Sequence, residues 1–558
     1  MYILGINCGH DATAALIKNE KIIAVVQEER KTRIKHQNGF PFLAIKEVLY
    51  IGGIEAKDID YIAWAGNDRR LQSIKELFWA IGGDKFYSYG GITKRIKTAI
   101  AENTKGIWNF NGNLKKLKLN KKKSFFFEHH LCHASSAYRN SGFQKALILT
   151  IDGVGDNISA TVNIGDKGLI KRIAKTSPKH SIGLLYQAVT EALGFVPVEG
   201  EYKTMGLAAY GDKIKLYNYF NNIISYENLR FKSKFIWESN WQFPAPSIRQ
   251  HILFKNLLKQ YKKEDIAASC QAVCEDVIYR FVNDVVKKTD IHNICVAGGV
   301  FLNVKANKII REKVPLDSLY IHPDAGDGGL ALGAALELYF NLTGSMPRDK
   351  LDNTYFGRSY ANEEIKKELD RNNLKVYYFE DIEKKAAELL KSGKVIGWFQ
   401  GRMEMGPRAL GNRSVLADPR NPSVKEKINK HLKKRDWFVP FAPSILEEDS
   451  NLYIKEFNGY APFMIMAFDA DVTKKELIPA VVHVDNTLRP QIVRKEFNLS
   501  YWKLIKSFKE LTGIGVVLNT SFNRHGLPMV ESPKDAVEHL LDRNIDTLVI
   551  GNYIVDRP

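Results

Sequence analysis

The chain opens twice with the same pattern of apolar runs and glycine-containing polar turns. Apolar runs at residues 2–7, 13–17 and 22–27 are separated by two such turns, and residues 146–152 and 159–164 repeat the first two runs. Short apolar runs bounded by turn residues predict strands. Two similar openings within an alternation of strands and helices favour an α/β fold built from two related halves.

The length of the chain requires more than one hydrophobic core. At 558 residues it exceeds what a single ordinary domain contains. Helical patterns cover residues 263–288 and 330–342, after which a polar stretch is followed by a new strand and helix series near Val376. We therefore predict one domain over residues 1–351 and a second α/β domain over residues 352–558.

Composition excludes several classes of protein. With 45% apolar residues and no run of about 18 apolar residues, the chain is predicted to be globular and cytoplasmic, without a membrane helix. Its five cysteines form no CxxC pair, so neither a disulfide framework nor a zinc ribbon is expected. Lys and Arg outnumber Asp and Glu by 81 to 63, and this net charge of +18 would attract a polyanion such as nucleic acid.

Part of the positive charge lies in residues 94–127, where lysines alternate with Trp108, Phe110 and the run 125–127. One interpretation is a solvated helical insertion that the lysines keep soluble. The other is a flap that faces an anion near a site.

Three glycine-containing turns follow predicted strands, at residues 5–11, 152–156 and 297–300. Without a side chain in the way, backbone N–H groups in such turns can approach a phosphate. In the third turn, the pair Gly298 and Gly299 would let a nucleotide lie against the main chain. One such turn is a weak signal, but three in this order strengthen one another.

Two histidines indicate a metal site. His129 and His133 lie four residues apart, so a helix would carry both imidazoles on one face. Asp152, at a strand end, and Asp327, in a glycine-rich turn, supply oxygen ligands. Two histidines and carboxylates with open positions suit Fe(II) or another divalent ion.

The last third of the chain is rich in arginine. Arg402, Arg408 and Arg413 lie among glycines in residues 401–414. Further candidates are Lys433, Arg435, Arg489 and Asn519. Arginines held in glycine-rich turns bind phosphates through two hydrogen bonds, so we predict an anion site here, although no Walker loop is present.

Taken together, these residues resemble the O-carbamoyltransferase family, which includes the nodulation-factor, cephem and aminoglycoside antibiotic carbamoyltransferases. The resemblance covers nearly the whole chain. It is carried by residues 9–15, 28–30, 129–134, 152–153, 203–208, 297–300, 326–329, 401–414, 440–444, 483–491 and 519–523.

The resemblance implies an actin-like (ASKHA, sugar-kinase-like) first domain, similar to the domain of tRNA threonylcarbamoyl transfer, followed by a YrdC-like domain. The second domain would convert carbamoyl phosphate and ATP, with Mg²⁺, into carbamoyl adenylate. The first would transfer the carbamoyl group to an acceptor hydroxyl. Iron would be held by His129, His133, Asp152 and Asp327. Gly298 and Gly299 would face the adenosine. The donor site would be lined by Arg402, Arg408, Arg413, Lys433, Arg435, Arg489 and Asn519, with Arg408 as a catalytic group.

The acceptor must also lose a proton. His10 or Asp11, beside the first glycine turn, is the candidate base, although His10 could equally serve only to bond the backbone. One departure from the family is plain, because Val439 stands where an arginine usually precedes Pro440. If that arginine contacts a phosphate, one charge-assisted contact is absent, and Lys434 is a candidate replacement.

The acceptor stays open between a sugar or antibiotic-like small molecule and the hydroxymethyl group of a modified pyrimidine in DNA. The rival functions are a tRNA threonylcarbamoyl-type or other actin-like nucleotide-dependent transferase, and a non-catalytic nucleotide-binding regulator. The oligomeric state is also open, with a homodimer as one form.

Overall fold

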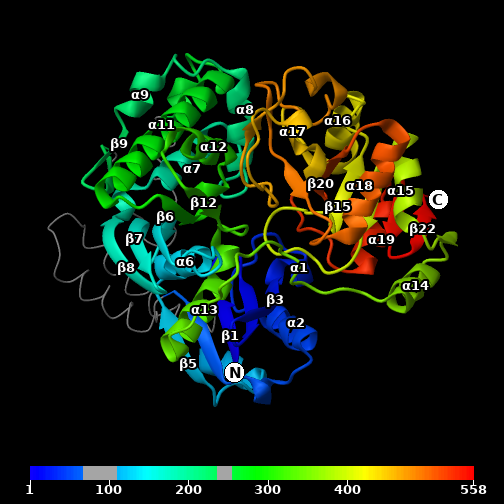
Figure 1. Cartoon of the computed structure of the whole chain (residues 1–558), viewed down its shortest axis with the longest axis horizontal. Helices are drawn as coiled ribbons and strands as arrows, with labels where there is room; N and C mark the ends of the chain where they lie inside the picture. The colour runs from blue at the N-terminus through cyan, green and yellow to red at the C-terminus, as the bar shows by residue number, and fades with distance from the viewer. Residues whose placement is uncertain (67–109, 235–253, 558) are drawn as a thin grey trace.

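Two five-stranded sheets of the same topology make up the first part of the chain. We analysed a computed structural model, which describes residues 1–66, 110–234 and 254–557 (Figure 1). The first sheet has the order β3-β2-β1-β4-β5, and the second has the order β8-β7-β6-β11-β12. In each sheet the first three strands are antiparallel and the last two run parallel to the central strand. The prediction of two related halves is therefore matched by the strand order.

The strands of the first sheet are β1 (Tyr2–Asn7), β2 (Thr13–Lys18), β3 (Lys21–Gln27), β4 (Tyr61–Ala65) and β5 (Lys123–Phe127). The strands of the second are β6 (Lys145–Gly155), β7 (Ile158–Asp166), β8 (Leu169–Thr176), β11 (Asn293–Ala297) and β12 (Ser318–Ile321). A small hairpin joins β9 (Ile224–Glu227) to β10 (Arg230–Ser233).

Two buried helices pack against each other between these sheets. Helix α13 (Leu330–Thr343) contacts the first sheet and α6 (His129–Tyr138) contacts the second. The close approach of α13 to β1 and to α6 requires a glycine at each contact. A Cβ on Gly5 would stand 2.0 Å from the Ala331 carbonyl oxygen, and a Cβ on Gly333 would stand 2.0 Å from the Cys132 carbonyl oxygen. Helix α13 is buried over most of its length, as its nearly unbroken apolar sequence requires.

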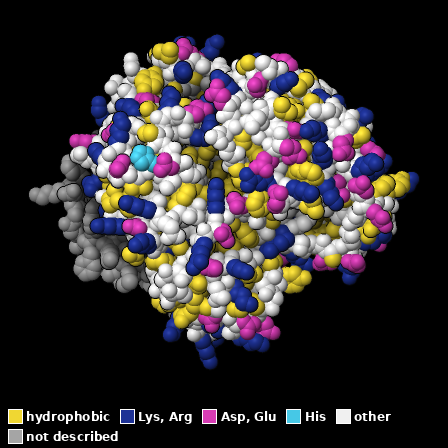
Figure 2. Space-filling model, viewed as in Figure 1, with side chains coloured by type: hydrophobic (Ala, Val, Ile, Leu, Met, Phe, Trp, Pro, Cys, Tyr) yellow, Lys and Arg dark blue, Asp and Glu magenta, His cyan; other side chains and the backbone are white. Residues whose placement is uncertain are grey.

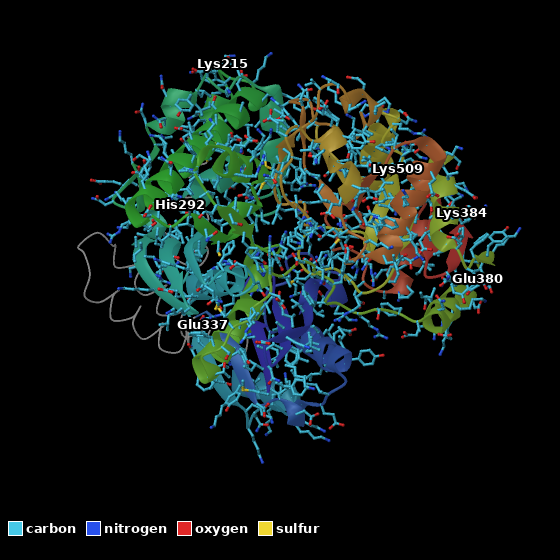
Figure 3. The ribbon with its side chains drawn as sticks, viewed as in Figure 1. Lys215, His292, Glu337, Glu380, Lys384 and Lys509 are labelled. Atoms are coloured by element: carbon cyan, nitrogen blue, oxygen red, sulfur yellow. The ribbon has the colours of Figure 1, made fainter. Side chains whose placement is uncertain are left out.

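One charged pair lies within this apolar layer. The Arg139 guanidinium, at the end of α6, lies 2.7 Å from the carboxylate of Glu337 on α13. Figure 3 labels Glu337. Both side chains are buried, so each charge depends on the other for its partner. The pair fixes the two central helices relative to each other.

The remaining helices of this part cover the outer faces of the sheets. They are α1 (Glu28–Thr32), α2 (Phe42–Gly52), α5 (Phe110–Lys116), α7 (Ile182–Ala192), α8 (Glu201–Leu207), α9 (Tyr217–Asn221), α11 (Lys263–Thr289) and α12 (Val304–Lys313). Of the lysine- and aromatic-rich segment, residues 94–109 lie outside the described residues. The rest forms α5 and the edge strand β5, and the helical insertion and the flap both stay predictions for the segment as a whole.

The last part of the chain is built on one eight-stranded sheet, with the order β13-β22-β21-β14-β15-β20-β16-β19. Its strands are β13 (Val376–Tyr378), β14 (Ile396–Phe399), β15 (Arg413–Ala417), β16 (Ala442–Leu446), β19 (Gln491–Val493), β20 (Val516–Ser521), β21 (Thr547–Ile550) and β22 (Tyr553–Asp556). Strands β17 (Phe468–Asp469) and β18 (Thr487–Leu488) form a separate pair. The helices are α14 (Asn362–Arg371), α15 (Ile382–Lys391), α16 (Ser423–Lys427), α17 (Ser450–Tyr453), α18 (Leu499–Thr512) and α19 (Pro533–Leu541). This series begins with α14, one helix earlier than the expected start near Val376.

The two parts share an extensive boundary (Figure 1). Arg33 donates to the Pro528 carbonyl oxygen over 2.9 Å, and Asn307 donates to that of Ile465 over 2.7 Å. Apolar residues near Phe438 continue the core that surrounds α11. Within the described ranges, no helix is both long and apolar enough to cross a membrane.

Candidate active site

A cavity of about 1030 Å³ lies along the boundary between the two parts of the chain. From the first part, it is lined by the loop after β1, by the start of α6 and by the loop before α13. From the second part, it is lined by Arg408, Arg435 and Arg489. The cavity therefore brings the predicted metal site and the predicted anion site into one space.

Helix α6 begins at His129 because its first backbone N–H groups find acceptors outside the helix. The Glu128 carboxylate accepts from the N–H groups of His130 and Leu131, and Asp156 accepts from that of His129. Arg172 pairs with the same Glu128 carboxylate. Such capping fixes the first turn, so His129 and His133 lie on one face of the helix, as predicted.

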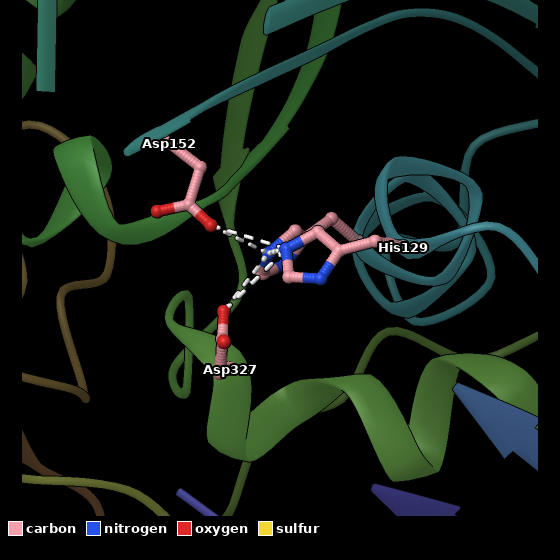
Figure 4. Close-up of side chains that lie close together, drawn as sticks. His129, Asp152 and Asp327 are labelled. Carbon is pink, nitrogen blue, oxygen red and sulfur yellow. Dashed lines mark hydrogen bonds and ion pairs between the residues drawn. The ribbon is translucent and has the colours of Figure 1, made fainter. Parts of the chain in front are cut away.

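Four donor atoms converge at this face (Figure 4). The Nε2 atoms of His129 and His133 lie 3.1 Å apart, and they lie 3.2 and 3.4 Å from Asp152 Oδ2. Their distances to Asp327 Oδ1 are 3.5 and 3.6 Å. Ligands bound about 2.1 Å from a single ion stand about 3 to 3.5 Å from one another, so this donor set fits one divalent cation.

Irregular backbone positions the two carboxylates. The pairing of β6 with β7 shifts register between Ile151 and Gly155, so the strand runs on through the predicted turn but frees Asp152 from regular pairing. Asp152 Oδ1 accepts from the N–H groups of Gly153 and Gly299, which leaves Oδ2 to face the histidines. These bonds orient the carboxylate before any cation binds.

The electrostatics of the cluster favour a bound cation. Burial lowers the pKa of His129, but Asp327 and Asp152 outweigh it and raise that pKa to about 9. Burial likewise opposes ionisation of Asp152, yet hydrogen bonds from His129 and His133 hold its pKa well below the usual value. His130 faces away, toward the Thr150 hydroxyl and the Ile158 carbonyl oxygen, and burial lowers its pKa well below normal. It is a structural histidine.

Three arginines form the second cluster, and none has an ion pair with a carboxylate within the described part of the chain. Burial lowers the pKa of Arg408 and of Arg435 to about 10. Burial and then repulsion from these two arginines lower the pKa of Arg489 well below its usual value. Like charges that are partly buried and lack counterions are costly, so the cluster is suited to bind an anion.

Lys433 and Asn519 also line this end of the cavity. The buried Lys433 ammonium donates to oxygens of Ser521 and Asn523, which fixes the loop after β20. The Asn519 amide nitrogen donates to the Ser444 hydroxyl, while its Oδ1 has no hydrogen-bond partner among the residues described.

The structure does not bring Arg402 and Arg413 to the cavity. Arg402 donates to the carbonyl oxygens of Gly357 and Ile23. Arg413 is fully buried, lies over the Phe399 ring and donates to backbone carbonyls that include that of Gln400. Their guanidinium groups are occupied by main-chain acceptors, so the expectation that they line the donor site does not match their position.

Backbone packing accounts for the paired glycines. A Cβ on Gly298, whose φ is +102°, would meet the Ile151 carbonyl oxygen at 2.3 Å. Gly299 lines the cavity and donates its N–H to Asp152.

Val439, which stands where the family usually has an arginine, lines the cavity. Lys434, the candidate replacement for that arginine, is exposed and lies outside the cavity lining, so the structure does not place it where the missing arginine would be.

His10 and Asp11 line the cavity close to the metal cluster, and Asn7 donates to the carbonyl oxygens of both His10 and Asp327. Beside them lies His36, which sequence reasoning missed. Its only signal was its place in the segment after Glu28-Glu29-Arg30, one of the stretches that carry the family resemblance.

The buried carboxyl of Asp324 makes the stability of the protein depend on pH. Burial, and then repulsion from Asp11, raise its pKa to about 8. Between about pH 4 and pH 8 the folded protein therefore holds a proton that the unfolded chain has released, and stability falls as pH rises through this window. Asp324→Asn has no carboxyl at this position and so does not lose stability in this way. We expect the urea midpoint of this variant, relative to that of the parent protein, to be higher at pH 8 than at pH 5. An advantage that does not grow with pH would contradict this prediction.

The fold and the two clusters define an α/β protein with a candidate metal site and a candidate anion site on one cavity. Comparison with known families gives the assignment. The family model described as Carbamoyltransferase N-terminus matches residues 2–336, and the model described as Carbamoyltransferase C-terminus matches residues 387–557. The chain belongs to the carbamoyltransferase family and is a carbamoyltransferase, so its interpretation as a non-catalytic regulator is wrong.

Similarity to individual proteins agrees with this family assignment. The chain is 35% identical to nodulation protein NolNO of Sinorhizobium fredii over 98% of this chain and 79% of that protein. It is 36% identical to nodulation protein NolO of Bradyrhizobium diazoefficiens over 76% of this chain and 78% of that protein. It is 25% identical to nodulation protein U of Sinorhizobium fredii over 96% of each.

Proposed function

We propose that the chain is an ATP-dependent O-carbamoyltransferase that carries out two steps within one cavity. In the first step, carbamoyl phosphate, water and ATP give carbamoyl adenylate, phosphate and pyrophosphate. In the second, an acceptor hydroxyl takes the carbamoyl group and AMP is released. The observation that carries the proposal is that the arginine cluster and the metal-ligand cluster line the same cavity.

Each step belongs to one part of the chain. We assign adenylate formation to a YrdC-like domain over residues 352–558 and transfer to an actin-like domain over residues 1–351. The repeated strand order of the first two sheets supports the actin-like assignment. The two family matches end and begin on either side of the boundary, at residues 336 and 387.

In the first step, Arg408, Arg435 and Arg489 bind the phosphate groups of carbamoyl phosphate and of ATP with its Mg²⁺. Charge-assisted bonds from these partly buried arginines favour the anions, because none of the three has an ion pair with a carboxylate of the described residues. Asn519 Oδ1 is free to accept from the carbamoyl amide.

In the second step, His129, His133, Asp152 and Asp327 would hold Fe(II) or another divalent cation. When bound, the cation supplies Lewis-acid chemistry at the adenylate phosphate. The cluster lies in the wall of the cavity, with His133 fully buried behind the other three ligands. His10, or Asp11 beside it, removes the proton of the acceptor.

We propose a small hydroxylated molecule, such as a sugar, as the acceptor. On the face shown in Figure 2, Lys and Arg are interspersed with Asp and Glu rather than gathered in a stripe. The relatives are named nodulation proteins NolNO and NolO, and neither name mentions DNA. A hydroxymethylated base in DNA is the other outcome that the experiment separates.

The test supplies the purified protein with ATP, Mg²⁺, Fe(II) and carbamoyl phosphate. We expect pyrophosphate release that depends on both substrates. Adding a panel of sugars and a hydroxymethylated DNA duplex should yield one product heavier by a single carbamoyl group. A neutral sugar should react almost independently of salt, whereas DNA modification should fall steeply as salt rises. Absence of carbamoyl-phosphate-dependent pyrophosphate release would refute the proposal.

A further inference from the structure

Two histidines share one carboxylate in the wall of the cavity. His10 Nδ1 lies 2.9 Å from Asp11 Oδ2, and His36 Nδ1 lies 2.8 Å from Asp11 Oδ1. The two imidazole rings stack with their centroids 4.9 Å apart. All three residues line the cavity. The carboxylate of Asp11 therefore has one imidazole on each of its oxygens.

The backbone holds this arrangement at a cost. Asp11 has a φ of +53° and His36 a φ of +55°, a left-handed conformation that is unfavourable for a residue other than glycine. The Ala12 N–H donates to the Gln37 carbonyl oxygen over 2.9 Å, which ties the two loops together. Two residues in this strained conformation contact each other, and a backbone hydrogen bond holds their loops together. This indicates that the contact between His36 and Asp11 positions the Asp11 carboxylate.

The hydrogen bonds determine which nitrogen of each ring is available. Because Nδ1 of each ring faces the carboxylate, a neutral imidazole here carries its proton on Nδ1 and leaves Nε2 as an acceptor. His10 is 38% exposed, toward the cavity. The Nε2 atom of His36 is buried and has no hydrogen-bond partner among the residues that the structure describes. His10 is thus the ring placed to meet an acceptor molecule.

We infer that His36 is a positioning residue, which acts through Asp11 to hold His10 with its Nε2 ready to accept the proton of the acceptor hydroxyl. This inference rests on the proposed transfer to a hydroxyl. His36 donates to Asp11 Oδ1, so the carboxylate cannot rotate away and its Oδ2 stays on His10. The same logic positions the base in other enzymes that pair histidine with aspartate.

The chemical step balances. The acceptor oxygen bonds to the carbamoyl carbon, and the bond from that carbon to the phosphate oxygen of AMP breaks. The acceptor proton passes to His10 Nε2, and AMP leaves as the anion. Asp11 stabilises the resulting imidazolium, because its Oδ2 lies 2.9 Å from His10 Nδ1.

The test compares two nucleophiles on the Fe(II)-loaded full chain with ATP and carbamoyl phosphate. One is the sugar of the panel that reacts fastest, or water where none reacts. The other is hydroxylamine, which attacks before it loses a proton and gives hydroxyurea without a base. For His36→Leu, we expect kcat for the alcohol to fall about 10- to 100-fold. Its KM, hydroxyurea formation and pyrophosphate release should not change.

His36→Asn is the rescue variant, because its amide nitrogen can donate to Asp11 in place of Nδ1, and it should restore most of the alcohol transfer. If His36→Leu does not fold, His36→Gln replaces it, since that amide reaches the position of Nε2 instead. Three results would each overturn the inference. They are unchanged alcohol transfer in His36→Leu, equal losses of transfer in His36→Leu and His36→Asn, and loss of a bound metal ion when His36 is replaced. A parent protein that releases no pyrophosphate would overturn the proposed function and this inference with it.

Discussion

Replacing His129 with alanine is expected to remove the bound metal and to lower carbamoyl transfer by about a thousandfold or more, while pyrophosphate release continues. Loss of one of four ligands leaves a weakened cation site, and the charge that develops on the adenylate phosphate then lacks its main counterion. The arginine cluster, to which we assign adenylate formation, lies in the other part of the chain and is unchanged. Metal content by elemental analysis, together with separate assays of the two half-reactions, measures each effect.

His130→Gln is the matched control, because His130 is the next residue on the same helix and faces the Thr150 hydroxyl instead of the cluster. It should retain its metal and its transfer activity, at some loss of stability. Asp327→Asn should resemble His129→Ala. If a folded His129→Ala protein loses both half-reactions together, the division of labour between the two parts of the chain is wrong.

Local patterns predicted the elements well where the residues themselves determine the backbone. The runs at residues 2–7, 13–17 and 22–27 became β1, β2 and β3 almost to the residue, because short apolar runs bounded by turn residues are a local signal. The extension of β6 through Gly155 was not predicted. Its bulge depends on the partner strand β7, and a partner is not visible within one segment.

Side-chain direction explains the errors at the site. His129 and His133 were correctly predicted to share a face because helical spacing alone fixes that relation. By contrast, nothing in the sequence of residues 401–414 distinguishes Arg408, which faces the cavity, from Arg413, which donates to carbonyls such as that of Gln400. His36 was missed for a similar reason, since its partner Asp11 lies 25 positions away in the chain.

Replacing Arg489 with methionine is expected to weaken the first half-reaction and at the same time to stabilise the protein. One lost charge-assisted contact to phosphate, worth about 1.5 to 3 kcal/mol, corresponds to a fall of about 10- to 150-fold in kcat/KM for carbamoyl phosphate. Removing one of three mutually repelling, partly buried arginines relieves a cost that a bound anion offsets. Thermal unfolding in phosphate-free buffer should therefore show a higher midpoint than that of the parent protein.

Added inorganic phosphate separates the binding effect from the stability effect, because at a given concentration a ligand of the folded state raises the unfolding midpoint more the more tightly it binds. The parent protein should gain more from phosphate than Arg489→Met does. Arg413→Met is the control: it is also a buried arginine, but its loss strands the carbonyl oxygens of Gln400 and Arg358 and should lower the midpoint. If both variants are destabilised alike and respond equally to phosphate, the arginines of the cavity are structural, and the anion chamber has to be sought elsewhere.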